Sequence, residues 1–567
     1  MKNKFTKNYS NEFQSFALSK IFENSDNSIH IHLFRREGEL NQFAESIRFF
    51  NKEVEVLVYP SWDCLPYSNI SPRKEIISRR YGALRASNNK CENCKIVLLS
   101  LDSILQKIVP TKEILSKNFY IRTDQDVDLA NLVQWLEKMG YSRQPNVYSV
   151  GEYAVRGGIL DVFVPELKYP IRLDFFGTKL EKIRTFDPSS QRSNGSIKEI
   201  KIFPVSEIIL DKRSIDIFRQ NYRRIVGAVQ SSDRVYSSIS ENILIDGIEH
   251  WLPLFNEKLE PIFSAFRGAS LSYDYDLHSM IENKWEQIIE SRSYDLKASN
   301  NNKLSLLDPS SHYLSPSEFL DAIDLYNIKK IDQIFTNDLK TSYAPTKDFA
   351  VERNKEDTSL FSEVVKYIKQ RLKQHSIILS GHSNGSIKRL LSVLKDHDLS
   401  ITRKIENVNE IYKSPKQIYY SVTPIDLGFS TPLFEIITEK AIFGGKLRSA
   451  RAAKRRNLTA VFEDLNSLNV EDLIVHIDYG IGKFMGLKNF EINDVNNDFL
   501  EINYSGSDKI FLPVENIELI SPLGLADAKL DKLGSANWQL RKATVKKKIK
   551  EIAEKLIKVG SLGQTQK

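Results

Sequence analysis

The stretch IRLDFFGTKLEKIRTFDP, residues 171–188, decides the fold of the segment around it. Apolar and charged residues alternate on both sides of Gly177-Thr178, and this period of two predicts two strands joined by a tight turn. The preceding run GGILDVFVP, residues 157–165, has the same strand-like composition. A β-rich domain is therefore expected here, between flanking segments that follow a different pattern.

Alternation along the first of these strands gives its two faces distinct compositions. One face carries Ile171, Leu173 and Phe175, and the other carries Arg172, Asp174 and Phe176. If the first face is the core, Phe176 is exposed beside Arg172 on an open sheet, which is the composition of a protein-binding hot spot. The alternative is that a second layer covers Phe176, and the pattern alone leaves both interpretations open.

The rest of the chain changes pattern several times along its length. Strand-like runs at residues 53–60 and 95–100 lie among helical patterns, which predicts a parallel α/β sheet. Short strands separated by Gly, Asn, Asp and Ser turns predict a small SH3/Tudor-like β-barrel near the C-terminus. We therefore expect a multidomain α/β and β protein. Its expected segments are α/β parts at 1–118 and 204–335 that flank a β-rich insert at 119–203, a small α/β domain at 345–445, a basic linker at 446–460, the barrel at 461–525 and a basic helix within 526–567.

Composition is that of a soluble globular protein. The chain has 567 residues, of which 41% are hydrophobic and 27% charged, and its net charge is +7. No run of about 18 apolar residues occurs, and the first residues lack the apolar core of a signal peptide. We therefore expect a cytoplasmic protein with no membrane partner.

Two basic clusters are candidates for phosphate contact. The candidate residues are Lys446, Arg448, Arg451 and Arg455 in the first cluster and Lys546 and Lys547 in the second. Cations at this density can neutralise phosphates, although a basic helix face is also commonly just solvated. A nucleic-acid-binding accessory protein is therefore one functional hypothesis.

Two short motifs indicate other chemistry. Cys91 and Cys94 form one C-x-x-C, but a zinc site needs further ligands, so we interpret them as reduced thiols in a surface loop and expect no metal. GHSNG, residues 381–385, matches the G-x-S-x-G of serine hydrolases, with Ser383 as the nucleophile. The acid and histidine that complete a catalytic triad do not follow Ser383 at the usual positions in the sequence. The alternative is that Ser383 begins a helix. We expect no catalytic residue.

Longer stretches carry a resemblance to a known family. They include GEYAVRGGILDVF at 151–163, VHIDYGIGKFMGL at 475–487 and LDKLGSANWQLRKATVKKKIK at 530–550. With these stretches in this order, the chain resembles the bacterial transcription-repair coupling factors (Mfd). The resemblance implies a helicase-like α/β module similar to the excision-repair protein UvrB, with a β-rich insert that binds UvrA. It also implies that the barrel binds RNA polymerase.

The resemblance further implies which residues make these contacts. The UvrA-binding residues of the family fall on Arg156, Arg172 and Phe176. The family's barrel pairs an edge strand with the polymerase β subunit, and the matching strand is DFLEINY, residues 498–504. Because strand addition uses free backbone groups and an apolar anchor, we place Leu500 and Ile502 at that interface.

ATP chemistry is expected to be absent from this chain. No G-x-x-x-x-G-K-[ST] occurs, and where UvrB carries a phosphate loop this chain has Gly38 without Gly-Lys-Thr. The family's ATP and magnesium belong to a DNA translocase that follows the basic helix, and the family contacts DNA mainly through it. We therefore expect a non-enzymatic adaptor without a cofactor, which binds stalled RNA polymerase and recruits UvrA to DNA lesions in transcription-coupled nucleotide-excision repair.

Overall fold

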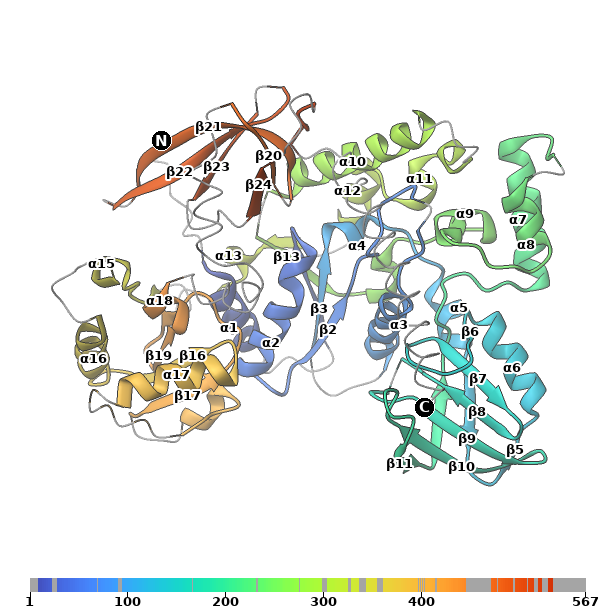
Figure 1. The fold of residues 1–567 in the computed structure, drawn as a ribbon, viewed down its shortest axis with the longest axis horizontal. Helices are drawn as coiled ribbons and strands as arrows, with labels where there is room; N and C mark the ends of the chain where they lie inside the picture. Colours follow the sequence, from blue (N-terminus) through green and yellow to red (C-terminus); the bar gives the residue numbers. More distant parts are fainter. Residues whose placement is uncertain are drawn as a thin grey trace. The chain divides into compact units, whose positions relative to one another are not determined.

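The structure is a computed structural model, and the chain divides into two compact units (Figure 1). One unit comprises Ser25–Leu40 and Glu55–Lys330, and the other comprises Met1–Asn24, Asn41–Val54 and Ile331–Lys567. The residues that the structure describes are 9–22, 28–68, 70–89, 94–165, 167–230, 233–274, 276–297, 303–324, 328–335, 343–353, 360–395, 397, 399, 401, 403–412, 416–444, 471–476, 478–492, 495–506, 508–513, 519–522 and 529–533.

The unit of residues 25–40 and 55–330 contains the expected parallel sheet. Its strand order is β14-β13-β1-β3-β2, and all neighbouring pairs are parallel. The strands are β1 (Ile29–Phe34), β2 (Glu55–Tyr59), β3 (Lys95–Ser100), β13 (Ser270–Tyr273) and β14 (Ile328–Lys330). The inner strand β3 is buried along its whole length, as expected for a parallel strand covered on both faces.

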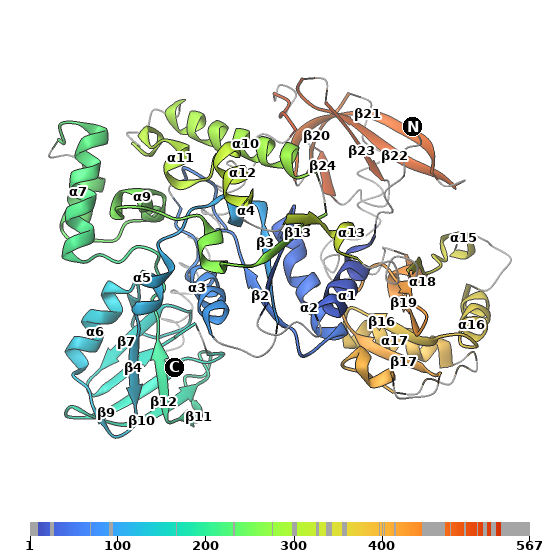
Figure 2. The same ribbon diagram turned by 180° about the vertical axis from the view of Figure 1, so that it is seen from behind.

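Helices and turns complete this α/β module. Figure 1 and Figure 2 both show α3 (Lys74–Asn88) alongside β2. The other elements are α4 (Leu101–Leu105), α5 (Thr111–Ser116), α7 (Lys212–Val226), α8 (Arg234–Ser240), α9 (Leu252–Phe255), α10 (Leu277–Lys297), α11 (Pro309–His312), α12 (Pro316–Asp324) and the 3-10 turns η1 (Glu37–Glu39), η2 (Ile248–Trp251), η3 (Ile262–Phe266) and η4 (Leu304–Leu306).

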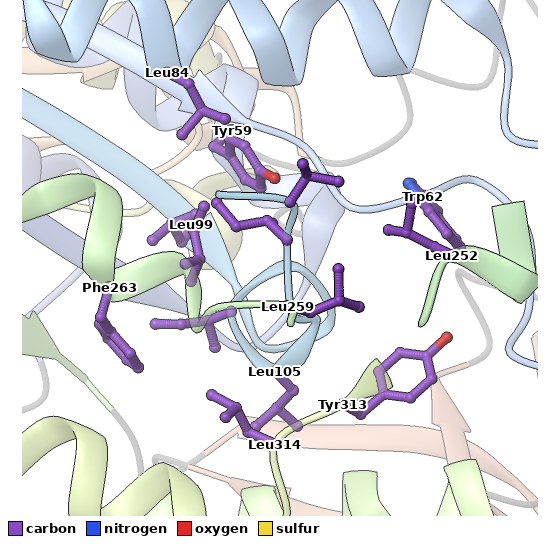
Figure 3. Close-up of a cluster of buried hydrophobic side chains, with 14 of the residues drawn as sticks. Tyr59, Trp62, Leu84, Leu99, Leu105, Leu252, Leu259, Phe263, Tyr313 and Leu314 are labelled. Atoms are coloured by element: carbon purple, nitrogen blue, oxygen red, sulfur yellow. The ribbon is translucent and has the colours of Figure 1, made fainter. Parts of the chain in front are cut away.

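The hydrophobic core of this module joins segments that are distant in the sequence. Figure 3 shows side chains from strand ends and from the 252–314 region directed toward one another. They include Tyr59, Trp62, Leu84, Leu99, Leu105, Leu252, Leu259, Phe263, Tyr313 and Leu314. The return of the chain after the β-rich segment therefore completes a core that residues 28–118 do not fill alone.

The β-rich segment forms a separate, mainly antiparallel sheet in the same unit, in which β6 and β7 pair in parallel. Its order is β11-β10-β9-β8-β7-β6, and β5 pairs with β10. The strands are β5 (Gln125–Asp126), β6 (Ser142–Arg143), β7 (Glu152–Arg156), β8 (Ile159–Val162), β9 (Ile171–Phe176), β10 (Lys179–Phe186) and β11 (Ser193–Ile197), with β4 (Phe119–Arg122) pairing β12 (Glu199–Ile202). The predicted hairpin is confirmed: β9 and β10 pair around Gly177, whose φ of 61° suits glycine.

One face of the β-rich sheet packs on helix α6 (Leu129–Lys138). Leu132 and Leu136 of α6 share a core cluster with Ile171 and Leu173 of β9. The helix begins at Asp128, whose carboxylate accepts hydrogen bonds from the Ala130 and Asn131 amides. The face predicted to be core is therefore the buried one.

A buried arginine of the α/β module pairs with Glu207, five residues beyond the last strand of the β-rich segment. Arg80 of α3 donates from Nε to the Glu207 carboxylate at 2.6 Å, and both side chains are buried. The guanidinium also lies over the Tyr59 ring, 4.6 Å from its centroid. Breaking this pair would leave one charge without compensation in the interior.

The other unit contains the second α/β domain. Its sheet order is β15-β18-β19-β16-β17, with β16 (Ser376–Gly381) parallel to both β17 (Ile418–Val422) and β19 (Phe434–Thr438). β15 (Ala344–Pro345) and β18 (Phe429–Ser430) complete the sheet. The remaining elements are α1 (Asn11–Ile21), α2 (Leu40–Phe50, its first residue in the other unit), α13 (Ile331–Ile334), α15 (Ala350–Arg353), α16 (Leu360–Arg371), α17 (Asn384–Lys395), α18 (Glu439–Phe443) and the 3-10 turn η5 (Val408–Ile411).

The C-terminal β segment is a five-stranded antiparallel sheet with its own core. Its order is β23-β22-β21-β20-β24. The strands are β20 (Leu473–His476), β21 (Gly480–Ile492), β22 (Val495–Asn503), β23 (Lys509–Pro513) and β24 (Ile520–Pro522). Glycine at position 482 leaves room for the core, because a Cβ there would lie 2.5 Å from the Ile502 side chain.

Some expected features lie outside the described residues. They are the basic linker 446–460, the basic helix within 526–567, Cys91, and the candidate phosphate contacts Lys446, Arg448, Arg451, Arg455, Lys546 and Lys547. Across the part of the chain that the structure describes, no helix combines the length and apolar character needed to cross a bilayer.

Candidate functional site

The three residues selected for UvrA contact lie on one face of the β-rich sheet. Strand pairing places Arg156 opposite Ile159, Ile159 opposite Asp174, and Asp161 opposite Arg172. Paired residues project to the same side of a sheet. Arg156, Arg172 and Phe176 therefore share the face opposite the α6-packed core.

Arg172 is fixed in place by its neighbours on this face. Its guanidinium donates Nε to Asp161 Oδ1 at 2.7 Å and a terminal nitrogen to Oδ2 at 2.9 Å. Its carbon also lies 4.7 Å from the centroid of the Phe186 ring. The side chain of Asp161 is 2% exposed and that of Arg172 is 16% exposed. The hydrogen bonds to Asp161 raise the pKa of Arg172, so the guanidinium remains charged and oriented.

A second arginine extends the charged part of the face. Arg184 lies opposite Arg172 on β10 and makes its own bidentate pair with Asp174, with both distances 2.7 Å. Arg156 is exposed and donates to the Pro145 carbonyl at 2.9 Å and to the Asn146 side chain. The face therefore presents several oriented guanidinium groups.

Phe176 is the apolar element of the same face. It is 79% exposed, whereas Ile171 and Leu173 of the same strand are fully buried. A second layer does exist, formed by Val147, Ala154 and Phe163 over Phe186, and Phe176 lies outside this cluster. Of the two interpretations left open by the sequence pattern, the structure favours the exposed one.

The structure corrects the placement of the two residues expected at a polymerase interface. Leu500 and Ile502 are 2% and 0% exposed and belong to the core of the C-terminal sheet. In addition, residues 499–503 of β22 pair with β21 on one side and β23 on the other, so their backbone is not an open edge. Strand alternation correctly placed Leu500 and Ile502 on the same face, but that face is the buried inner one.

The outer face of this sheet carries an aromatic cluster that our sequence analysis missed. The rings of Phe490 and Phe499 have centroids 5.5 Å apart, and those of Phe490 and Phe511 have centroids 4.9 Å apart. Phe490 and Phe511 are 39% and 42% exposed. Beside them, Glu501 pairs with Lys509 at 2.8 Å and Lys488 at 3.8 Å. The residues of this outer face alternate along the strand with Leu500 and Ile502, and that alternation was the signal available in the sequence.

Ser383 has the geometry of a helix cap. Its hydroxyl accepts the Ser386 amide at 3.1 Å, and its own amide donates to the Ser386 hydroxyl at 3.1 Å. The neighbouring His382 pairs with Asp426 at 2.8 Å. Ser383 also lacks the positive φ of a strained strand-to-helix elbow. The arrangement begins α17 and does not resemble a nucleophile with its base.

A carboxylate lies at the carboxyl ends of neighbouring parallel strands in the first α/β module. Glu37 follows β1, and its Oε2 accepts the Ser61 amide at 3.2 Å and the Ser100 hydroxyl at 2.8 Å. Ser61 and Ser100 lie at the carboxyl ends of the neighbouring parallel strands β2 and β3. Burial raises the pKa of Glu37. These donors are the kind that would otherwise bind a nucleotide phosphate.

Comparison with known proteins identifies two domains in the chain. The family model of the UvrB interaction domain matches residues 119–208, and that of the CarD-like/TRCF RID domain matches residues 468–524. The first match contains the Arg172 face, and the second contains the aromatic cluster.

Relatives with the name transcription-repair-coupling factor match almost the whole chain. The protein of Rickettsia bellii is 29% identical over 557 residues, which are 96% of this chain and 48% of the relative. The protein of Haemophilus influenzae is 28% identical, with coverage of 89% and 44%, and that of Escherichia coli is 25% identical, with coverage of 95% and 46%. The resemblance to the transcription-repair coupling factors is therefore confirmed, and the chain spans about half the length of the curated relatives it matches.

Proposed function

We propose that this chain acts as an adaptor in transcription-coupled nucleotide-excision repair, binding stalled RNA polymerase with one domain and UvrA with another. The observation that carries the proposal is Phe176, a large aromatic side chain that is 79% exposed among fixed arginines in the matched UvrB interaction domain. Exposed aromatic and arginine side chains are the residues that dominate protein interfaces. The name and domains of the relatives support the same role.

The proposed UvrA contact is the face that carries Arg156, Arg172 and Phe176. Because Asp161 orients Arg172 before any partner binds, less conformational entropy is lost on association. Phe176 stabilises little in the free chain, so its burial would contribute to binding alone. The contact therefore combines an apolar anchor with preorganised donors for carboxylates or carbonyl oxygens of the partner.

Capture of purified UvrA on the immobilised chain tests this contact. Phe176→Ala should weaken capture by about 30-fold or more, because removal of a central aromatic anchor costs about 2 kcal/mol or more. Leu244→Ala is the matched control, since Leu244 is an exposed apolar residue of the same unit outside the β-rich sheet. Undiminished capture by the Phe176 variant, or equal loss in the control, would refute the assignment.

We propose the cluster of Phe490, Phe499 and Phe511 as the contact for the polymerase β subunit. It replaces the buried Leu500 and Ile502 as the apolar anchor, and it lies in the domain matched to the CarD-like/TRCF RID model. β23 has one described neighbour, β22, so its other side is the place for strand addition next to Phe511.

The two surfaces can be separated by mutation. Phe511→Arg should abolish capture of the polymerase β subunit and leave UvrA capture unchanged, because the change is confined to an exposed side chain. Leu500→Ala should instead lower the free energy of unfolding of the C-terminal sheet by about 2–5 kcal/mol, as for other buried leucines. Retention of polymerase by the Phe511 variant would contradict the proposed contact.

We further propose that the first α/β module is a helicase-type fold without nucleotide chemistry, so that the chain by itself is not an ATPase and holds no cofactor. The Glu37 carboxylate accepts the amide and hydroxyl hydrogen bonds that a phosphate would need. Calorimetric titration with Mg-ATP should give no saturable binding. Saturable heat that disappears on Ser100→Ala would show that the module does bind a nucleotide.

A further inference from the structure

Helix α16 and the turn that follows it carry a row of lysines that neither proposed protein-binding surface uses. Lys366, Lys369 and Lys373 are exposed and border a shallow hollow of about 520 Å³. The other residues that line the hollow are Ser362, Val365, Gln370 and His397. None of the lining residues is acidic.

The row follows from the amphipathic pattern of the helix. Lys366 and Lys369 are three residues apart on α16, so they share one side of the helix axis, and Lys373 lies in the turn after the helix ends at Arg371. The opposite side of the helix packs into the domain through Val364 and Ile368, which are fully buried. Lys366 and Lys369 therefore stand on the solvent side of a helix whose other side is held in a core.

Buried polar contacts fix the helix to the sheet. Tyr367 donates its hydroxyl to Glu435 of β19 at 2.6 Å, and Arg371 pairs with the other oxygen of the same carboxylate. Glu435 is fully buried, so this pairing constrains both the rotation and the position of α16. The backbone that carries Lys366 and Lys369 is consequently held in place.

Charges near the row are predominantly positive. Lys416 donates its ammonium group to the Lys373 carbonyl at 3.1 Å, which adds a fourth cation at the end of the helix. Among the described residues, one ion pair involves the row: Lys366 pairs with Glu363 at 3.7 Å. At that separation on an exposed surface, the pair removes little of the positive potential.

We propose that this row, Lys366, Lys369 and Lys373, binds the phosphate backbone of duplex DNA without reading its sequence. The three lysines border one hollow, so their ammonium groups can contact neighbouring phosphates of the same duplex. Lysine ammonium groups are compact point charges that suit phosphate oxygens and lack the fixed fork with which arginine reads guanine.

The residues lining the hollow decide between kinds of polyanion. His397 is the one ring among the lining residues and Phe, Tyr and Trp are absent from them, so the hollow offers no run of rings on which successive bases of a single strand could stack. An open, shallow surface suits a stiff polyanion with evenly spaced charges better than a flexible acidic polypeptide, which would lose chain entropy on binding. Duplex DNA is the polyanion of that kind.

Fluorescence anisotropy with the full chain and a labelled duplex of mixed sequence tests the proposal. Changing all three lysines to glutamine should reduce the slope of log affinity against log salt by about 2–3, since each phosphate contact contributes about 0.9. The matched control changes Lys112, Lys198 and Lys201 to glutamine, which removes the same charge from other exposed positions. The control should leave the slope within about one unit of the unaltered chain.

Three outcomes would overturn the proposal. They are an unchanged slope in the α16 variant, an equal loss in the control, and tighter binding of a labelled polyglutamate than of the duplex, which would identify an acidic protein as the ligand. Circular dichroism establishes that the α16 variant is folded. Capture of UvrA and of the polymerase β subunit should be unaffected by this variant, so failure of the DNA proposal is distinguishable from failure of the adaptor proposal.

Discussion

Arg172→Ala should affect both the stability of the β-rich sheet and the binding of UvrA. The substitution leaves the Asp161 carboxylate 2% exposed, without the two hydrogen bonds of 2.7 and 2.9 Å that it now accepts from the guanidinium. Loss of one partner from a buried pair costs about 3–5 kcal/mol. Because Arg172 is 16% exposed and water can reach the vacated space, we expect about 3 kcal/mol, or roughly a 150-fold increase in local opening.

Hydrogen exchange followed by mass spectrometry measures this opening directly. Amides of β8 and β9 should exchange roughly 150-fold faster in Arg172→Ala, whereas Phe176→Ala should leave them within a factor of about two, because its side chain is largely solvated. The double variant Asp161→Asn with Arg172→Ala removes the buried charge and should regain most of the lost protection.

UvrA capture separates the two roles of Arg172. If the guanidinium touches the partner, the double variant stays deficient in capture although its sheet is again protected. Restored capture in the double variant would mean that Arg172 acts only by holding the fold. Unchanged exchange in the single variant would refute the buried ion pair on which the magnitude rests.

Three further predictions concern stability. Glu207→Gln should lower the free energy of unfolding of its unit by about 3–5 kcal/mol in a urea titration, because Arg80 is left buried without its counter-charge; no change would show that the pair is not closed in solution. Ser383→Ala should lower the free energy of local opening at the start of α17 by about 1 kcal/mol, which speeds hydrogen exchange there. Labelling of unaltered Ser383 by a fluorophosphonate probe would contradict its capping role. Burial lowers the pKa of His30 and His32 to about 3, so below their ordinary pKa of about 6.5 the unfolded chain binds protons that the folded chain does not. Stability should therefore fall as the pH decreases from about 6.5 toward 3, by up to about 1.4 kcal/mol per pH unit for each histidine, and His30→Gln should make the urea-derived slope shallower; an unchanged slope would show that His30 does not titrate this way.

The sequence was informative where local pattern and tertiary environment agree. Two-residue alternation around Gly177 predicted the β9–β10 hairpin, and the face with Ile171 and Leu173 is the buried one. The same alternation also singled out Phe176 and Arg172, because it places an aromatic residue beside an arginine on the polar face. The same pattern could not say whether another layer would cover that face.

The C-terminal sheet shows why strand parity alone is insufficient. In DFLEINY, parity separates Leu500 and Ile502 from Phe499 and Glu501, but both sets contain apolar side chains. Which set is inside depends on how β21, β22 and β23 curve around their core, and that curvature depends on glycine and a bulge elsewhere in the sheet. The aromatic residues that form the outer cluster come from three strands, and no single strand reveals their meeting.

By itself, the sequence determined the local alternation of strands and helices, the absence of a phosphate loop and the identity of the charged and aromatic residues. Tertiary structure alone decided that Asp161 holds Arg172, that Glu37 takes the donors at the strand ends, and that Leu500 and Ile502 are core. The physical reason is that burial and hydrogen bonding depend on neighbours brought together by strand pairing. Periodicity along one strand constrains its own two faces, but it carries no information on what packs against either of them.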